Sequence, residues 1–157
     1  MSQFAFSTPA FDDGERIPKR FTCDGADASP PLSFADVPDD TARLAVTVDD
    51  LDTPNESLVH WLVWNLPPEL DGLPADVSPV RKLDDLGGAY QGTNGFGDVG
   101  YRGPCPAEDD GAHTYRFTLH ALGVPLDAKG GATRPDLIDE LRGARIASAK
   151  FTGVCER

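Results

Sequence analysis

The sequence lacks any long hydrophobic run. Within its 157 residues no apolar stretch reaches the roughly 18 residues that a membrane-spanning helix needs. The segment Met1 to Phe6 has neither the basic region nor the apolar core of a signal peptide. We therefore expect a soluble, cytoplasmic protein without integral membrane contact. The length fits a single domain over residues 1–157.

Lysine and glutamate are scarce. The chain has 4 lysines against 10 arginines and 6 glutamates against 20 aspartates, and its net charge is −12. A negative surface argues against binding to the backbone of a nucleic acid or to an anionic membrane, so no nucleic-acid partner is expected. The aspartate bias resembles that of proteins from salt-loving organisms. It predicts an acidic, halophilic protein that loses stability when salt is removed. An ordinary acidic cytosolic protein is the alternative interpretation of the same composition.

Cysteine is also scarce. Cys23, Cys105 and Cys155 lie far apart, and no CxxC pair occurs. This spacing predicts neither a disulfide framework nor a zinc ribbon. Free thiols in a reducing cytoplasm are favoured, and a single bridge between Cys23 and Cys105 is the alternative, because both lie in loop-like sequence.

Histidine occurs three times, and two of these residues, His60 and His113, open apolar segments that follow Pro- and Gly-rich loops. An unpaired imidazole is unfavourable in an apolar strand, so each needs a partner. The two are more than fifty residues apart and lack HxH or HExxH spacing. The sequence therefore predicts neither a metal site nor a cofactor.

Strands dominate the predicted secondary structure. Alternating apolar residues and β-branched content predict buried strands over 44–48, 59–65 and 113–122. Shorter strands are expected near 3–6, 31–34 and 146–153. Residues 69–100 show little periodicity and are interpreted as a long surface excursion.

One helix is predicted. Thr133, with Pro135 and Asp136 after it, is a typical N-cap sequence and precedes apolar residues at helical spacing. Gly143 is expected to end the helix.

In the strand over 113–122, a period of two puts His113 and Tyr115 on one face. His120 falls on the opposite face. The strand follows a stiff loop from Gly100 to Pro106, in which glycine permits close backbone approach and proline fixes the backbone. This loop is predicted to form one wall of a ligand site.

An acidic pair ends the strand over 44–48. Asp50 and Asp52 point in the same direction and would raise each other's proton affinity unless donors intervene. Aspartate is abundant here, so a solvated turn is the simpler interpretation. A hydrolase with Asp50 and His60 as base and orienter is another, but its nucleophile is missing. The chain has no GxSxG elbow, and Cys105 lies between two prolines.

Several motifs, in the same order, resemble those of the phosphatidylethanolamine-binding proteins, the family that includes Raf kinase inhibitor protein. The resemblance covers nearly the whole chain and is strongest to the bacterial and archaeal branch. The motifs are Ile17-Pro-Lys-Arg-Phe-Thr-Cys-Asp-Gly25, Ser29-Pro-Pro-Leu32, Asp50-Leu-Asp-Thr-Pro54, Val59-His-Trp-Leu-Val-Trp-Asn65, Gly92-Thr-Asn-Gly-Phe-Gly97, the Gly100 to Pro106 loop, His113-Thr-Tyr115 and Glu156-Arg157.

The resemblance implies a mainly β fold, an antiparallel β-sandwich with a large central sheet, a smaller sheet and one or two short helices. It also implies a small anion-binding pocket at one end. The pocket residues and their neighbours are Asp50, Asp52, His60, Gly103, Pro104, Pro106, His113 and Tyr115. Protonated histidine, the tyrosine hydroxyl and backbone N–H groups can donate to an anion, so affinity should rise as the pH falls toward the histidine range.

Three positions depart from the family pattern. Leu51 stands where the family usually has proline, Thr114 where it often has arginine, and Cys155 where it often has tyrosine. These changes free one backbone donor at the rim, remove a cation near the pocket, and remove an aromatic ring at the end of the chain.

The resemblance therefore implies non-enzymatic binding of a phosphate- or carboxylate-bearing ligand, such as phosphate or a phosphorylated head group. A protein partner, a kinase or a protease that the chain inhibits, is the family-level form of this function. A homodimer is also expected. The alternative is a hydrolase or lyase that uses Asp50, His60 and His113 as acid/base groups. A third interpretation is a structural partner protein whose pocket is a vestige.

Overall fold

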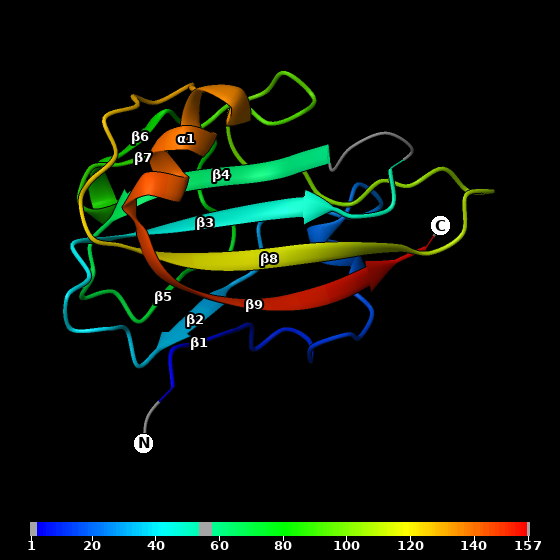
Figure 1. Ribbon diagram of the computed structural model, residues 1–157. Coiled ribbons are helices and arrows are strands. Elements are labelled where there is room, and N and C mark those ends of the chain that lie inside the picture. Colours follow the sequence, from blue (N-terminus) through cyan, green and yellow to red (C-terminus); the bar gives the residue numbers. More distant parts are fainter. Residues whose placement is uncertain (1–2, 54–57, 157) are drawn as a thin grey trace.

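The computed structural model describes residues 3–53 and 58–156, and most of its regular structure is β-strand (Figure 1). Pro54 and Arg157, the last residues of two sequence motifs, lie outside the described residues. A six-stranded antiparallel sheet has the order β6-β7-β4-β3-β8-β9, and a three-stranded sheet has the order β1-β2-β5. The predicted mainly β architecture, with a large and a small sheet, is confirmed.

The elements have the following bounds. The large sheet contains β3 (Arg43–Asp50), β4 (Leu58–Leu66), β6 (Lys82–Leu83), β7 (Ala89–Gln91), β8 (His113–Leu122) and β9 (Arg145–Cys155). The small sheet contains β1 (Ala5–Ser7), β2 (Leu32–Ala35) and β5 (Gly72–Leu73). The helical segments are α1 (Arg134–Ala144) and the 3-10 turns η1 (Lys19–Phe21) and η2 (Asp84–Leu86). No helix in the described ranges is both long and apolar enough to cross a membrane.

Each of the six predicted strands overlaps an observed one. Residues 69–100 differ from the prediction, because they contain β5, β6, η2 and β7. β7 pairs with β4, and β6 pairs with β7, so this segment completes one edge of the large sheet. Strands of two or three residues are too short to show an alternating pattern, which is why the sequence did not reveal them.

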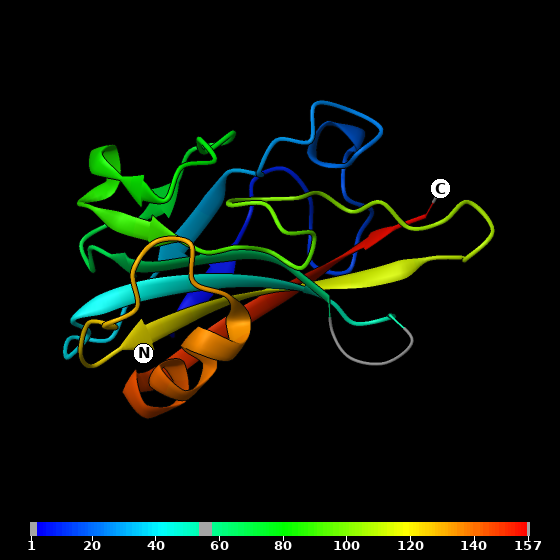
Figure 2. The same cartoon turned by 90° about the horizontal axis from the view of Figure 1, so that it is seen from above.

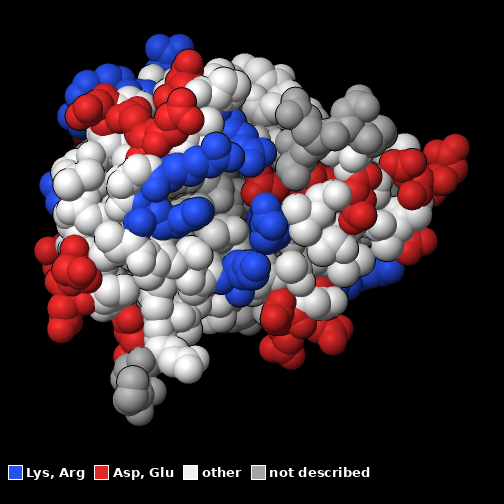
Figure 3. Space-filling model, viewed as in Figure 1, with Lys and Arg blue, Asp and Glu red and all other residues white. Residues whose placement is uncertain are grey.

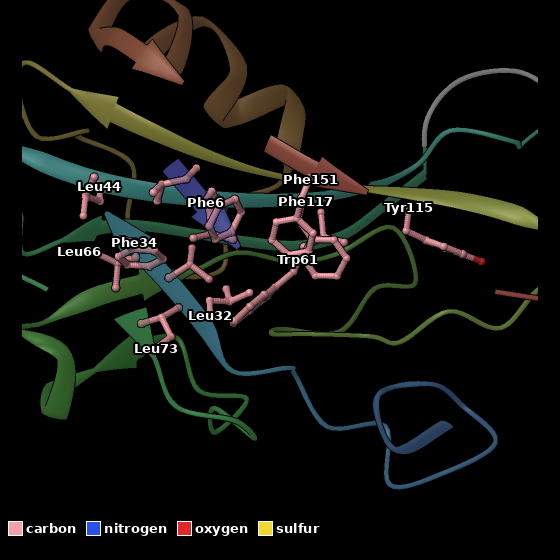
Figure 4. Packing of buried hydrophobic residues seen from close by; sticks show 14 of the residues in the cluster. Phe6, Leu32, Phe34, Leu44, Trp61, Leu66, Leu73, Tyr115, Phe117 and Phe151 are labelled. Carbon is pink, nitrogen blue, oxygen red and sulfur yellow. The ribbon is translucent and has the colours of Figure 1, made fainter. Parts of the chain in front are cut away.

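The main hydrophobic core lies between the two sheets (Figure 4). Phe6 comes from the small sheet, and Trp61, Phe117 and Phe151 come from the large one. The rings of Phe117 and Phe151 stack with their centroids 4.7 Å apart. Figure 4 shows Tyr115 at one end of this cluster, with its hydroxyl directed away from the other labelled residues.

The helix α1 packs on the other face of the large sheet (Figure 2). At its start the Asp136 carboxylate accepts hydrogen bonds from the backbone N–H and the hydroxyl of Thr133, as the capping pattern predicts. Leu137 and Leu141 are buried in a second hydrophobic cluster beneath the helix. The helix ends one residue beyond Gly143, and β9 follows it directly.

A disulfide joins Cys23 to Cys105, 82 residues apart in the sequence. The expectation of free thiols is therefore wrong for these two residues, and the alternative bridge is present. Cys155 is buried and takes no part in this disulfide. The proximity of Cys23 and Cys105 arises from the packing of two distant loops, which no local spacing reveals. The cytoplasmic expectation loses the support that it took from reduced thiols.

Candidate functional site

Adjacent strands of the large sheet bring polar side chains together at one end of the core. β3 lies between β4 and β8, and Asp50 at the end of β3 is directly opposite Tyr115 of β8. His113 precedes Tyr115 by two residues and therefore shares its face of the sheet. With His60 of β4, these residues form a buried group that we call the Asp50 cluster.

A β-bulge in β4 brings His60 into this cluster. Val48 pairs with Trp61, and the next residue of β3, Asp49, pairs with Val59, so His60 is left over between them. A bulge changes the face toward which a strand residue points. The His60 ring consequently lies edge-on to the ring of the tyrosine in the cluster, with the two centroids 5.2 Å apart.

His113 lies between two carboxylates. Its Nδ1 is 2.7 Å from Asp50 Oδ2, and its Nε2 is 2.8 Å from Asp110 Oδ2. Carboxylate oxygens accept hydrogen bonds, so both ring nitrogens donate and the imidazole is protonated. Burial lowers the pKa of His113, but the hydrogen bonds to Asp50 and Asp110 outweigh that effect and leave the pKa above its ordinary value.

Asp50 is the hydrogen-bonding centre of the cluster. Its Oδ1 accepts from the Asp52 backbone N–H at 2.9 Å. Burial and the negative charge of Asp50, a hydrogen-bond partner of the Tyr115 hydroxyl, raise the pKa of that tyrosine, so the hydroxyl keeps its proton. The Asp52 carboxylate accepts from the Thr114 backbone N–H at 2.6 Å. Asp52 therefore ties the turn after β3 to β8.

His60 is satisfied at only one of its ring nitrogens. Nδ1 donates to the backbone carbonyl of Arg102 across 2.6 Å. Nε2 is buried and has no hydrogen-bond partner in the part of the chain that the structure describes. Burial lowers the pKa of His60, so the ring is neutral and Nε2 carries a lone pair. A buried polar atom left unpaired costs about 1–3 kcal/mol.

The Gly100 to Pro106 loop reaches the cluster through its backbone. Arg102 meets His60 twice: its carbonyl accepts from the ring Nδ1, and its backbone N–H donates to the His60 carbonyl at 3.0 Å. Gly103 N–H instead donates to Asp27 Oδ1 at 2.8 Å. A Cβ at Gly103 would collide with the Asp27 carboxylate and with the backbone of Phe21 and Thr22, so only glycine fits there. The Pro104 carbonyl accepts a hydrogen bond from the backbone N–H of Cys23. Pro106 is buried. The loop thus supports the cluster from outside.

Two side chains of the site were not identified from the sequence. Asp110 accepts a hydrogen bond from Nε2 of His113. It lies in an acidic run three residues before His113, and this spacing could have identified it as a partner of the histidine. Phe96, whose side chain is 40% exposed, meets the His60 ring edge-on at 5.2 Å. It precedes the cluster in a Gly-rich segment without any chemical pattern, so only the fold brings it here.

The described residues contain no group of three or more His, Cys, Asp or Glu side chains placed to hold a metal ion. The hydrolase interpretation paired Asp50 with His60. In the structure the carboxylate of Asp50 is hydrogen-bonded to His113 instead. Cys105, the one nucleophile considered, is part of a disulfide and has no thiolate to offer.

Comparison with known proteins gives consistent matches over the whole chain. Residues 7–156 match the family model for the phosphatidylethanolamine-binding protein. A UPF0098 protein of Methanothermobacter thermautotrophicus is 43% identical over 150 residues, which cover 96% of this chain and 97% of the relative. The crystal structure of Escherichia coli YbcL is described as that of a new member of the mammalian PEBP (phosphatidylethanolamine-binding protein) family. It superposes with a TM-score of 0.89, 30% identity and 99% coverage of both chains. The PEBP homolog CT736 of Chlamydia trachomatis superposes with a TM-score of 0.87, 35% identity and coverage of 98% of this chain and 97% of its own.

Proposed function

We propose, for a chain that belongs to the phosphatidylethanolamine-binding protein family, that the Asp50 cluster binds a small ligand through a phosphate or carboxylate group and does not turn it over. The observation that carries this proposal is the buried Nε2 of His60, which has no hydrogen-bond partner among the described residues. His60 and the cation His113 both adjoin the ring of Tyr115, with centroid distances of 5.2 and 6.4 Å. A ligand that supplies a hydrogen-bonding oxygen satisfies the unpaired nitrogen and meets a positive charge.

Asp110 supports this proposal, because its carboxylate already shows how an anionic group can bind to His113. Its carboxylate lies 2.8 Å from His113 Nε2, although its side chain is 56% exposed. Because the Asp110 carboxylate itself lies largely in solvent, its pairing with His113 gains little over hydration, and an external anion can replace it. The ligand oxygen would take the position of the Asp110 carboxylate, and Asp110 would turn to solvent.

Binding is coupled to protonation of His60. Its Nδ1 already donates to a backbone carbonyl, so Nε2 can donate to an anion only when the ring is protonated. Burial lowers the pKa of His60, and an anion at Nε2 raises it again. Binding therefore takes up a proton, and anion affinity rises as the pH falls. The pKa of His113 is raised by its hydrogen bonds to Asp50 and Asp110, so this residue keeps its charge to a higher pH than an ordinary histidine.

Calorimetric titration with sodium acetate and inorganic phosphate between pH 8 and pH 5.5 tests this coupling. We expect affinity to increase by up to about tenfold per pH unit, the limit for uptake of one proton. Acetate stays ionised over this range, so it separates protonation of the site from protonation of phosphate. Acetate affinity that is flat with pH contradicts the proposal.

A matched pair of variants locates the binding site. Asp110→Asn removes the internal competitor at His113 and should increase phosphate affinity several-fold. Asp109→Asn, the exposed neighbour in the same loop, should leave it unchanged, and His113→Ala should abolish binding. Equal affinities in the two asparagine variants would refute the role of Asp110. Turnover of p-nitrophenyl phosphate that His113→Ala abolishes would favour the acid/base hydrolase or lyase instead.

We further propose that the anionic group is presented by a protein, so that the chain regulates a kinase or protease, and that it acts as a homodimer. Leu51 and Phe96 support this, because they expose 39% and 40% of their surface next to Asp50 and His60. Apolar residues around a polar site suit a macromolecular contact. A phosphoserine peptide should bind more tightly than free phosphoserine, and light scattering should give twice the 16.8 kDa chain mass. Equal affinities and a monomer mass contradict this proposal.

A further inference from the structure

A cavity of about 230 Å³ lies on the opposite side of the large sheet, between α1 and the outer faces of β3, β8 and β9. We call it the α1 cavity. Its lining residues are Thr47, Asp49, Leu62, Arg116, Thr118, His120, Arg134, Leu137, Ile138, Leu141, Arg145, Ser148 and Lys150. It shares no residue with the Asp50 cluster, since alternate residues of β3 and β8 face opposite sides of the sheet.

The α1 cavity is positively charged in a strongly acidic protein. Four of its lining side chains are cations, Arg116, Arg134, Arg145 and Lys150, and one is a carboxylate, Asp49. Figure 3 shows Lys and Arg side chains gathered around a hollow on this face. The whole chain has 14 basic against 26 acidic residues, so this concentration of positive charge is opposite to the overall balance and favours an anion.

The cations of the cavity are only partly neutralised. Arg116 and Arg134 lie 3.7 and 3.8 Å from the Asp49 oxygens, which are contacts longer than a hydrogen bond. Neither Arg145 nor Lys150 has an ion pair within residues 3–53 and 58–156. The guanidinium donors that face the cavity therefore have capacity for a further anionic partner.

The floor of the cavity is polar and contains an unsatisfied group. Strand register puts Thr118 beside Thr47 on one side and Lys150 on the other, and puts His120 beside Ser148. The His120 ring is 4% exposed, and its Nε2 lies 3.0 Å from the Thr47 hydroxyl. Its Nδ1 has no partner among the described residues. A buried nitrogen without a partner, below a ring of cations, is a second sign that a ligand belongs here.

The wall formed by α1 is apolar. Leu137, Ile138 and Leu141 of the helix, with Leu62 of β4, line this side of the cavity. Inorganic anions gain nothing from such a wall, whereas a short hydrocarbon part gains about 25 cal/mol for each Å² of apolar surface that it buries. The volume suits a small molecule and is below the usual range for drug-sized ligands.

We propose that the α1 cavity is a second ligand site, which binds a small organic anion with a carboxylate or phosphate head and a short apolar part. The head contacts the guanidinium groups and Lys150, and the apolar part lies against α1. This site is independent of the Asp50 cluster in both position and ligand shape.

The three histidines make the experiment specific, because His120 lines the α1 cavity whereas His60 and His113 belong to the Asp50 cluster. Butyl phosphate and sodium butyrate are titrated while the imidazole resonances are followed by NMR. We expect saturable shifts of the His120 resonances with these two probes and none with butylammonium. The affinity of inorganic phosphate, measured from the His120 shifts, should be at least about tenfold lower than that of butyl phosphate. If these probes shift only His60 and His113, or if inorganic phosphate acts on His120 as strongly as butyl phosphate, the proposal is overturned.

Arg145→Gln and Arg142→Gln are a matched pair for this site. Both residues are exposed near the end of α1, but only Arg145 lines the cavity. Arg145→Gln should weaken butyl phosphate binding about tenfold, the effect of losing one charge-assisted hydrogen bond. Arg142→Gln should leave it unchanged, and acetate binding at the Asp50 cluster should be the same in both variants. Equal butyl phosphate affinities in the two variants would also overturn the proposal.

Discussion

The Asp50 cluster and the α1 cavity are built in part from consecutive residues of the same two strands. Asp50 and Asp49 are neighbours in β3, and Tyr115 and Arg116 are neighbours in β8, yet each pair divides between opposite faces of the sheet. In the Asp50 cluster a histidine cation lies between two of the protein's own carboxylates. In the α1 cavity cations outnumber carboxylates. Under the two proposals, a ligand of the first site displaces the Asp110 carboxylate, whereas a ligand of the second enters a cavity with more cations than carboxylates in its lining.

The disulfide distinguishes the two sites most strongly. It closes a loop of 82 residues and secures the Gly100 to Pro106 loop, whose Arg102 carbonyl holds His60. In the chain-entropy model, a loop of this length stabilises the fold by about 4 kcal/mol. The double variant Cys23→Ser, Cys105→Ser should therefore lower the free energy of urea unfolding by about this amount and weaken acetate binding at His60. The α1 cavity lacks such a link, so its butyl phosphate affinity in the folded variant should not change.

Equal losses of acetate and butyl phosphate affinity in this variant would mean that the disulfide supports the whole fold and not one site. Reduction of the wild-type protein with dithiothreitol serves as the control, because it breaks the same bond without a substitution.

The two adjacent aspartates provide the next comparison. Asp50→Asn leaves the buried His113 cation without its main partner and should lower the free energy of unfolding by about 3 kcal/mol. Asp49→Asn should cost less, about 1 kcal/mol, because burial already raises the pKa of Asp49 and its contacts to Arg134 and Arg116 are long. Urea unfolding at pH 7 measures both. A larger loss for Asp49→Asn would reverse the comparison between the sites.

The histidines of the two sites should respond to pH in opposite ways. Burial, with the nearby charges of Arg145 and Arg116, lowers the pKa of His120 to about 4. The unfolded chain therefore binds a proton at His120 in a range where the native protein does not, and stability falls as the pH drops from about 6.5 to about 4. His113 has a raised pKa. Its contribution is present below the ordinary histidine pKa and is lost as the pH rises through the raised value.

His120→Gln isolates the first of these effects. The pKa difference of His120 corresponds to about 3 kcal/mol between pH 6.5 and pH 4. Wild type and variant should differ in the slope of unfolding free energy against pH over that range, with the smaller slope in the variant. Parallel pH profiles for the two proteins would show that His120 titrates normally.

The features of both sites that depend on local sequence patterns could be predicted. The long strands and the side chains that share a face, such as His113 with Tyr115 and His120 opposite, follow from a period of two and were predicted correctly. The capped helix was predicted for a similar reason, since its signals are local. The position of His60 in the cluster depends on a bulge, and alternation alone would have put it on the other face.

Long-range packing defined the features that the sequence could not reveal. The bridge between Cys23 and Cys105 and the contact of Phe96 with His60 join segments that no local pattern connects. The α1 cavity combines residues from β3, β8, β9 and α1, and its basic side chains are scattered among acidic ones along the chain. Only the register of β8 with β9 and the helix above them reveals a cationic site.

Salt should give the smallest effect on stability, and it should act differently on the two sites. With a net charge of −12, the acidic surface repels itself over about 30 Å at 0.01 M salt and over only about 3 Å at 1 M. Desalting should lower the unfolding temperature by a few degrees, the shift expected for about 1 kcal/mol. An unfolding temperature that does not change between molar and low-millimolar salt would contradict the halophilic interpretation.

Salt should also act differently on ligand binding at the two sites. Arg116 and Arg134, whose side chains are 37% and 40% exposed, are screened by salt, whereas the His113 side chain, at 8% exposure, is shielded from it. Butyl phosphate binding at the α1 cavity should therefore weaken more steeply with potassium chloride than acetate binding at the Asp50 cluster, because screening acts mainly on charges that contact solvent.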